Sequence, residues 1–232
     1  MNFIRNTLFL PLVGICMILM LFSFITDFKT VKRRNSLFVM ALSSMLLLLS
    51  DKITYMYNGT AGAKFFIIVR STKFMAYAMF LVILYAYNKY LEDLYLNEGN
   101  FKKIPKKLQL TEYFIGVGLT ILVTNQYTGI YYTFDSSNLY HRSQGYFLAY
   151  VFPLICMLLQ IFAIIQYRKS LRKNVVISLV VFTTTPILAS FVQFFVHGVS
   201  LTSLTIVSMI ILLYCFSILD TNKQLKLAHK KR

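Results

Sequence analysis

The sequence contains no tryptophan, only 8 acidic residues and only three cysteines in 232 residues. Without tryptophan, anchoring at a membrane interface is left largely to the 16 tyrosines. Cys16, Cys156 and Cys215 all lie inside apolar runs, with no metal-ligand spacing and no pairing pattern. We therefore interpret them as small hydrophobic side chains rather than as a metal site or a set of disulfides.

Catalytic signatures are also missing. The sequence has no glycine-rich phosphate-binding loop, no His-Glu-x-x-His zinc motif, no nucleophile elbow and no protein-kinase signature. His141, His197 and His229 are scattered, and none has a carboxylate close to it in sequence. We therefore expect no enzyme, no metal and no other cofactor within these residues.

Long apolar runs are what the chain has in abundance. It is 57% hydrophobic with a mean hydropathy of +0.64, and its apolar runs of about 20 residues are long enough to span a bilayer as helices. This composition excludes a soluble domain and predicts an all-α, polytopic membrane protein with seven transmembrane helices. The predicted ranges are 8–28, 36–57, 65–88, 110–127, 146–167, 175–196 and 202–220.

Basic residues outnumber acidic ones 24 to 8, and they gather between alternate apolar runs. This pattern is the positive-inside signature, so it predicts an external N-terminus and a cytoplasmic C-terminus, with anionic membrane lipids rather than nucleic acid as partners. Eighteen basic residues fall on the predicted cytoplasmic side: Lys29, Lys32, Arg33, Arg34, Lys89, Lys102, Lys103, Lys106, Lys107, Arg168, Lys169, Arg172, Lys173, Lys223, Lys226, Lys230, Lys231 and Arg232.

Charged residues inside the apolar runs mark the first candidate site. Arg70 and Lys73 lie three residues apart and therefore on one face of a helix. A cation in hydrocarbon costs about 2.5–3.5 kcal/mol even on lenient insertion scales, so it needs an anionic partner, a wet cavity or access to the interface. Asp51 in the preceding run reaches a similar depth if the two runs form a helical hairpin. We expect an ion-paired polar pocket between these helices.

Two interpretations of this pocket stay open. In the structural one, Asp51 pairs with Arg70 and fixes the second helix against the third, while Lys73 snorkels or meets a carbonyl. In the functional one, the two cations exceed the single acid, so an anionic ligand such as a carboxylate or a phosphate enters from outside. The tyrosines expected to line the entry are Tyr55, Tyr77 and Tyr140.

The segment 128–145 is the most polar of the predicted external stretches and the richest in aromatic and titratable groups. Asp135 and Asn138 bracket two serines, and such residues supply local backbone hydrogen bonds in turns. We predict a short hairpin with this turn, covering the outer mouth of the helix bundle. His141 and Arg142 follow the turn and are, with Asp135, further candidates for ligand binding.

The last two apolar runs carry features suited to signal transmission. Pro186 follows three threonines whose hydroxyls can bond back to the chain, so this position is either a hinge or a packing feature. Apolar and small residues continue past the membrane at heptad-like spacing, including Ile218 and Leu225. The spacing predicts one continuous helix that emerges into the cytoplasm and pairs with its copy in a homodimer, or else a basic, solvated tail.

Two segments carry a family resemblance. TGIYYTFDSSNLYHRSQGYFLAY (128–150) and VVFTTTPILASFVQFFVHGVSLTSLTIVSMIILLYCFSILDTNKQL (180–225) resemble the N-terminal seven-helix sensor region of bacterial histidine kinases and diguanylate cyclases, and Leu49-Ser50-Asp51 is similar to it. The resemblance implies a bacterial inner-membrane sensor domain over 1–220 and a basic tail or the start of a signalling helix over 221–232. It also implies a kinase or cyclase output domain that follows residue 232 or a cytoplasmic effector that acts in trans.

Two functions follow from these patterns. In the preferred one, an extracytoplasmic or membrane-borne cue shifts the last two helices, and the last helix transmits that motion to the output or partner. In the alternative, the chain is a small transporter or channel-like protein whose substrate path passes the pocket. Many transporters have internal repeats and a pair of broken helices in matching halves. The sequence shows neither feature, which is evidence against the alternative.

Overall fold

The computed structural model describes the backbone of residues 2–195 and 201–230 and the side chains of residues 9–192 and 201–223. Within these ranges the chain forms seven α-helices, one β-hairpin and two 3-10 turns. The elements are α1 (Asn2–Ile25), α2 (Val31–Tyr57), α3 (Ala63–Asn97), α4 (Lys106–Thr128), β1 (Tyr132–Phe134), β2 (Tyr140–Arg142), η1 (Gln144–Phe147), α5 (Leu148–Gln166), η2 (Arg168–Ser170), α6 (Lys173–Phe195) and α7 (Leu201–Lys230).

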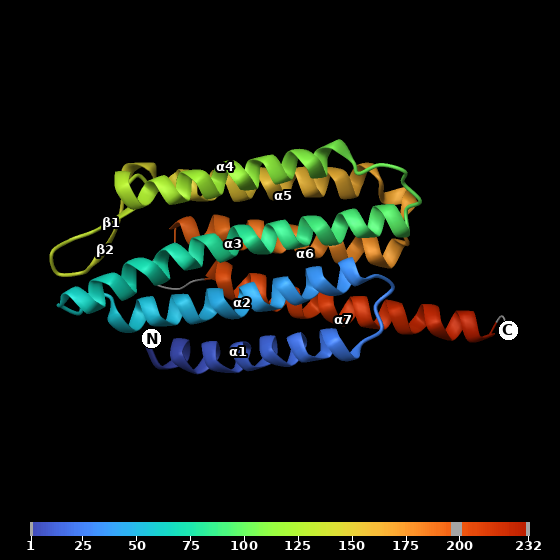
Figure 1. Ribbon diagram of the computed structural model, residues 1–232, viewed down its shortest axis with the longest axis horizontal. Helices are drawn as coiled ribbons and strands as arrows, with labels where there is room; N and C mark the ends of the chain where they lie inside the picture. Colours follow the sequence, from blue (N-terminus) through green and yellow to red (C-terminus); the bar gives the residue numbers. More distant parts are fainter. Residues whose placement is uncertain (1, 196–200, 231–232) are drawn as a thin grey trace.

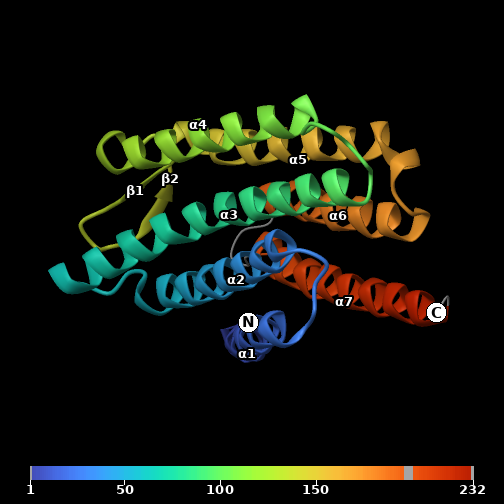
Figure 2. The same ribbon diagram turned by 45° about the vertical axis from the view of Figure 1, so that its right-hand side comes forward.

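The helices lie side by side in an elongated bundle (Figures 1 and 2). α4 and α5 form one side, α1 lies at the opposite edge, and α3, α6, α2 and α7 fill the middle. The hairpin and the α2–α3 turn share one end of the bundle, which we call the hairpin end. The connections 26–30, 98–105 and 167–172 share the other, which we call the basic end, and α7 projects beyond it (Figure 1).

Five stretches within the described residues are helical, long and apolar enough to cross a membrane. They are Val31–Tyr57, Ala63–Asn97, Gln144–Gln166, Lys173–Val192 and Leu201–Lys223, and α1 adds a shorter apolar stretch, Phe9–Ile25. The predicted all-α fold is confirmed, and each of the seven predicted ranges overlaps one helix.

Several helices extend beyond their predicted ranges, and in α2 and α3 polar residues of the added turns find partners. α2 begins at Val31, where the Thr30 hydroxyl accepts a hydrogen bond from the backbone N–H of Arg33 at 3.1 Å. α3 continues to Asn97 instead of ending at residue 88. Its extra turns bury Asp93, which receives a hydrogen bond from Thr30 Oγ1 at 2.7 Å and a salt bridge from Arg33 at 3.1 Å. Partners of this kind let a charged stretch remain helical inside a bundle.

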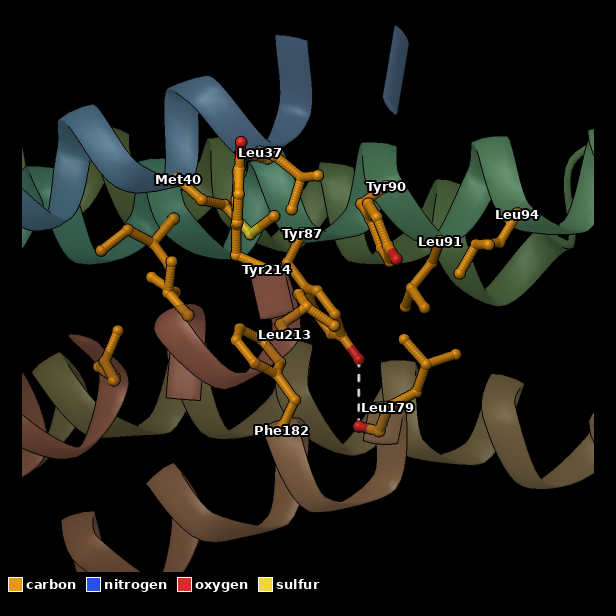
Figure 3. Packing of buried hydrophobic residues seen from close by; sticks show 14 of the residues in the cluster. Leu37, Met40, Tyr87, Tyr90, Leu91, Leu94, Leu179, Phe182, Leu213 and Tyr214 are labelled. Atoms are coloured by element: carbon orange, nitrogen blue, oxygen red, sulfur yellow. Dashed lines mark hydrogen bonds between the residues drawn. The ribbon is translucent and has the colours of Figure 1, made fainter. Parts of the chain in front are cut away.

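The largest core cluster lies between α2, α3, α6 and α7 (Figure 3). Tyr87 and Tyr214 are fully buried there beside Leu37 and Met40. The Tyr87 hydroxyl donates to the backbone carbonyl of Leu179 at 3.2 Å, which satisfies its polar end and joins α3 to α6 (Figure 3). Tightly packed aromatic residues thus occupy the middle of the bundle between its two ends.

Close packing also joins α4 to α3 and α5 at Gly118. A Cβ added there would lie 3.3 Å from Phe152 Cβ and 3.5 Å from Leu81 Cδ1, whereas one added at Gly116 would have no atom within 4 Å. We therefore expect Gly118→Val to overpack this contact and destabilise the protein by about 1–3 kcal/mol. Gly116→Val, on the same helix and with the same change in helix propensity, is the matched control.

The test is the apparent melting temperature of both variants in detergent. A clear decrease for Gly118→Val alone would support the close helix contact. Equal decreases would show that the loss comes from helix propensity and not from packing.

Candidate functional site

A cavity of about 70 Å³ lies near the hairpin end of the bundle. Residues from α2, α3, α5, α7 and the turn before α5 form its walls. The polar members of its lining are Asp51, Lys73, Tyr77, Tyr146, Tyr150, Thr202 and Ser203. These residues are far apart in sequence, so it is the fold that brings their polar groups together here.

Asp51 is buried with 4% of its surface exposed. Ser203 Oγ donates a hydrogen bond to Asp51 Oδ2 at 2.6 Å, which joins α2 to the first turn of α7. A buried carboxylate needs such donors, because desolvation without them costs several kcal/mol. Asp51, which the sequence analysis placed beside the third helix, therefore also binds the start of α7.

Lys73 lies half-buried in the same cavity and rests on aromatic faces. Its ammonium nitrogen is 5.4 Å from the ring centre of Tyr77 and 4.8 Å from that of Tyr140. The charged groups that act on it are Asp51, which attracts it, and Arg142, which repels it. Cation–π contacts stabilise an ammonium without using its N–H donors, so Lys73 has donors to offer a ligand in this cavity.

Arg70 corrects the predicted pairing. Its guanidinium is directed to α4, where Nε donates to Gln126 Oε1 at 3.3 Å and Nη2 donates to the Gln126 backbone carbonyl. Gln126 in turn donates to the Tyr132 hydroxyl at 2.9 Å. Arg70 is not part of the cavity lining, so the predicted Asp51–Arg70 pocket is divided between two places: Asp51 with Lys73 in the cavity, and Arg70 at the α3–α4 contact.

The predicted hairpin is confirmed, with its turn at Asp135 to Asn138. β1 and β2 are antiparallel, and Thr133 lies opposite His141. Asp135 Oδ1 accepts hydrogen bonds from the backbone N–H groups of Ser137 and Leu139, both at 2.9 Å. Asn138 adopts a left-handed φ of 62°, which asparagine tolerates better than most residues.

The hairpin is fastened to the α2–α3 turn. Gly59 N–H donates to the Asn138 carbonyl at 2.9 Å, and Tyr140 N–H donates to Asn58 Oδ1 at 3.0 Å. The side chain of Tyr140 reaches into the bundle, where its hydroxyl lies 3.3 Å from that of Tyr77. The hairpin thus places Tyr140 beside Lys73 and contributes to the surroundings of the cavity.

Asp135 and His141 lie at the surface of the hairpin. His141 Nε2 is 2.8 Å from Asp135 Oδ2, a partnership that the sequence interpretation missed. The hydrogen bond from His141, with those from Leu139 N–H and Ser137, lowers the pKa of the Asp135 carboxyl below its usual range. Arg142 stacks over the Tyr146 ring at 4.4 Å. His141 therefore contacts the turn, whereas Arg142 contacts a residue of the cavity wall.

The other predicted residues occupy different surroundings. Tyr55 packs near Phe9 of α1, with ring centres 6.5 Å apart, and is not part of the cavity lining. Pro186 is buried inside α6, and the three threonines before it bond back to carbonyls one turn earlier, as predicted. Ile218 packs against the core, and the side chain of Leu225 lies outside the described residues.

The heptad-like pattern of the last helix faces the bundle where its side chains are described. Tyr214 is 1% exposed, and Ile211 and Ile218 pack against the core cluster. Over this stretch the pattern therefore corresponds to packing within the chain, and not to an exposed seam for a second copy.

A network of charged residues at the basic end was not predicted. Arg33 on α2 is 3% exposed and forms salt bridges with Asp93 of α3 at 3.1 Å and with Glu98, just after α3, at 2.7 Å. Glu98 also pairs with Arg172 at 2.9 Å, and Arg172 pairs with Asp220 of α7. The network links α2, α3, the start of α6 and α7.

The sequence contains one sign of this network: most of its 8 acids, among them Asp93, Glu98 and Asp220, lie near the basic segments. Burial would raise the pKa of the Glu98 carboxyl, but the hydrogen bond from Arg172 and the charge and hydrogen bond of Arg33 outweigh it and lower the pKa. Burial would lower the pKa of the Arg172 guanidinium, but its hydrogen bonds to Glu98 and Asp220 outweigh this effect and raise the pKa.

Fold and composition together indicate a multi-pass helical membrane protein. No cluster of three or more metal-ligating His, Cys, Asp or Glu side chains occurs among the residues that the structure describes. No family model, no curated protein and no solved structure matches the chain.

Double-mutant cycles can distinguish the Asp51–Ser203 contact from the Asp51–Arg70 pairing that was predicted from the sequence. We expect Asp51→Asn and Ser203→Ala to be non-additive, with a coupling energy of about 1 kcal/mol. Asp51→Asn and Arg70→Gln should be additive, because Arg70 is directed to Gln126. The measurement is the free energy of unfolding in a detergent titration; strong coupling of Asp51 to Arg70 alone would contradict the geometry.

The lowered pKa of Glu98 predicts an effect of pH on stability. The ionised Glu98 contributes stability that is fully present above its unfolded pKa of about 4.3 and is lost as the pH falls through its lower folded pKa. Glu98→Gln removes this titration. Between pH 7 and pH 3, the apparent melting temperature of the native protein should decrease more steeply than that of the variant; parallel curves would rule out a stabilising role for the ionised Glu98.

Proposed function

We propose that the chain is a signal-receiving membrane module of a bacterial cell membrane. In this proposal all seven helices span the bilayer, the hairpin end is outside and the basic end is in the cytoplasm. The charge distribution supports this orientation, because positively charged segments remain on the cytoplasmic side. The resemblance of residues 128–150 and 180–225 to sensor regions of histidine kinases and diguanylate cyclases supports the same class.

One observation carries the proposal: α7 contacts both polar centres of the bundle. Near its first turn, Ser203 donates to the buried Asp51 in the hairpin-end cavity. Near the basic end, Asp220 on the same helix pairs with Arg172. A helix is stiff along its axis, so a change at one contact is carried to the other.

The input is an anionic group that reaches Lys73. Lys73 lies on the rings of Tyr77 and Tyr140, and Arg142 adds positive charge nearby. An anion here competes with Asp51 for the local positive charge and alters the Asp51–Ser203 contact. The ligand class is therefore a carboxylate or phosphate, as charge-assisted hydrogen bonds to an ammonium require.

The output is a movement of α7 at the basic end. There α7 continues as one helix to Lys230, past the Arg172–Asp220 pair. A ligand can shift this equilibrium only by its differential affinity for the two arrangements. In the proposal, a cytoplasmic effector or an output domain reads the position of the α7 end.

The transporter alternative has less support. The cavity of about 70 Å³ near the hairpin end is separated from the basic end by the fully buried Leu37, Met40, Tyr87 and Tyr214. A substrate path between the ends would have to open this packed region. Within residues 2–195 and 201–230, no pair of broken helices in matching positions favours such a movement.

Distance measurements between spin labels test the proposal. In a background without Cys16, Cys156 and Cys215, labels at the exposed Lys32 and Lys223 report the position of the α7 end. Lys73→Gln should change the distance distribution by about 1–2 Å, the scale of helix shifts in signalling. Thr120→Val, at an exposed position of α4, is the control.

An unchanged distribution in Lys73→Gln would contradict transmission through α7. Uptake of a labelled carboxylate or phosphate into vesicles that contain the native chain would instead favour the transporter.

A further inference from the structure

A second and larger cavity, of about 330 Å³, lies at the basic end of the bundle. Its lining comes from α2, α3, α6 and α7 and is mostly apolar. Ile177, Phe216 and Leu219 belong to its walls and are exposed on the outer faces of α6 and α7. The volume lies within the range typical of small-molecule sites, and an apolar molecule in the surrounding membrane has access to it.

Arg33 is one of the polar residues that line this cavity. It is 3% exposed, its Nε and Nη1 are paired with Asp93 and Glu98, and its Nη2 has no hydrogen-bond partner among the described residues. A buried guanidinium N–H without an acceptor is costly, and few natural structures keep one without a bound water, ion or ligand. The unmatched donor therefore points to an acceptor that belongs in the cavity.

The other polar groups favour an anion as that acceptor. The Asp220 carboxylate also lines the cavity, but Arg172 pairs with it. Ser217 and Tyr90 add hydroxyl groups, and Lys223 adds a cation. The segments around the cavity contain most of the basic residues of the chain, so their combined field attracts negative charge.

We propose that this cavity binds an anionic phosphate group attached to an apolar chain, as in an acidic phospholipid. The phosphate accepts a hydrogen bond from Arg33 Nη2, and the apolar chain lies along Ile177, Phe216 and Leu219. This site is distinct from the hairpin-end cavity and does not depend on the sensing proposal. Bound lipid would brace α7 against α6 beside the Arg172–Asp220 pair.

Native mass spectrometry of the purified full chain tests this site. After delipidation, the chain is mixed with dioleoyl phosphatidylglycerol or with dioleoylglycerol, which has the same chains and no phosphate. We expect retention of one phosphatidylglycerol per chain and at least tenfold weaker retention of dioleoylglycerol. Ser217→Leu, which fills the cavity, should abolish the difference, whereas Ser208→Leu, at an exposed position of the same helix, should preserve it.

A second pair of variants covers the case in which Ser217→Leu fails to fold. Ile177→Trp narrows the cavity at an exposed position, and Leu188→Trp, exposed on the same helix outside the cavity, is its control. Displacement of the lipid by millimolar inorganic phosphate would support a phosphate site in this cavity, with a soluble phosphate compound rather than a lipid as its ligand. Equal retention of both lipids, or equal effects of each variant and its control, would overturn the proposal.

Discussion

The buried guanidinium of Arg33 is the constraint around which the basic end is arranged. A cation this deeply buried is stable only with anionic partners, and removing one partner of such a pair costs about 3–5 kcal/mol. Asp93 and Glu98 supply the anions, which requires α3 to continue as a helix well past its apolar run. Glu98 also forms a salt bridge with Arg172, and Arg172 forms another with Asp220. One buried charge thereby fixes the relative positions of four helices.

The hairpin end follows the same physical rule with different groups. Asp51 is buried, and a hydroxyl from α7 supplies the hydrogen bond that it needs. Lys73 is stabilised by two aromatic rings, one of which is brought by the β-hairpin. Between the ends, apolar and aromatic packing isolates the two polar centres (Figure 3). α7 carries a hairpin-end contact through Ser203 and a basic-end contact through Asp220, and α2 and α3 likewise carry residues of both centres.

Local patterns in the sequence predicted the helices and the hairpin, because hydropathy and turn residues act over short distances. The turn at Asp135 and the back-bonding threonines before Pro186 are examples. The pairing of Arg70 was wrong, because the spacing of Arg70 and Lys73 shows a shared face but not which helix lies against it. The Arg33 network could not be predicted, because its members are up to 187 residues apart and meet only when four helices are packed.

Hydrogen exchange along α7 tests the central claim, that this helix connects the two polar centres, most directly. Backbone amides are compared between the native chain and Lys73→Gln. We expect exchange to change near Ser203 and again near Asp220, with little change in the tightly packed stretch around Tyr214. A change confined to the surroundings of Ser203 would contradict the claim, because the basic end would then be insensitive to the cavity.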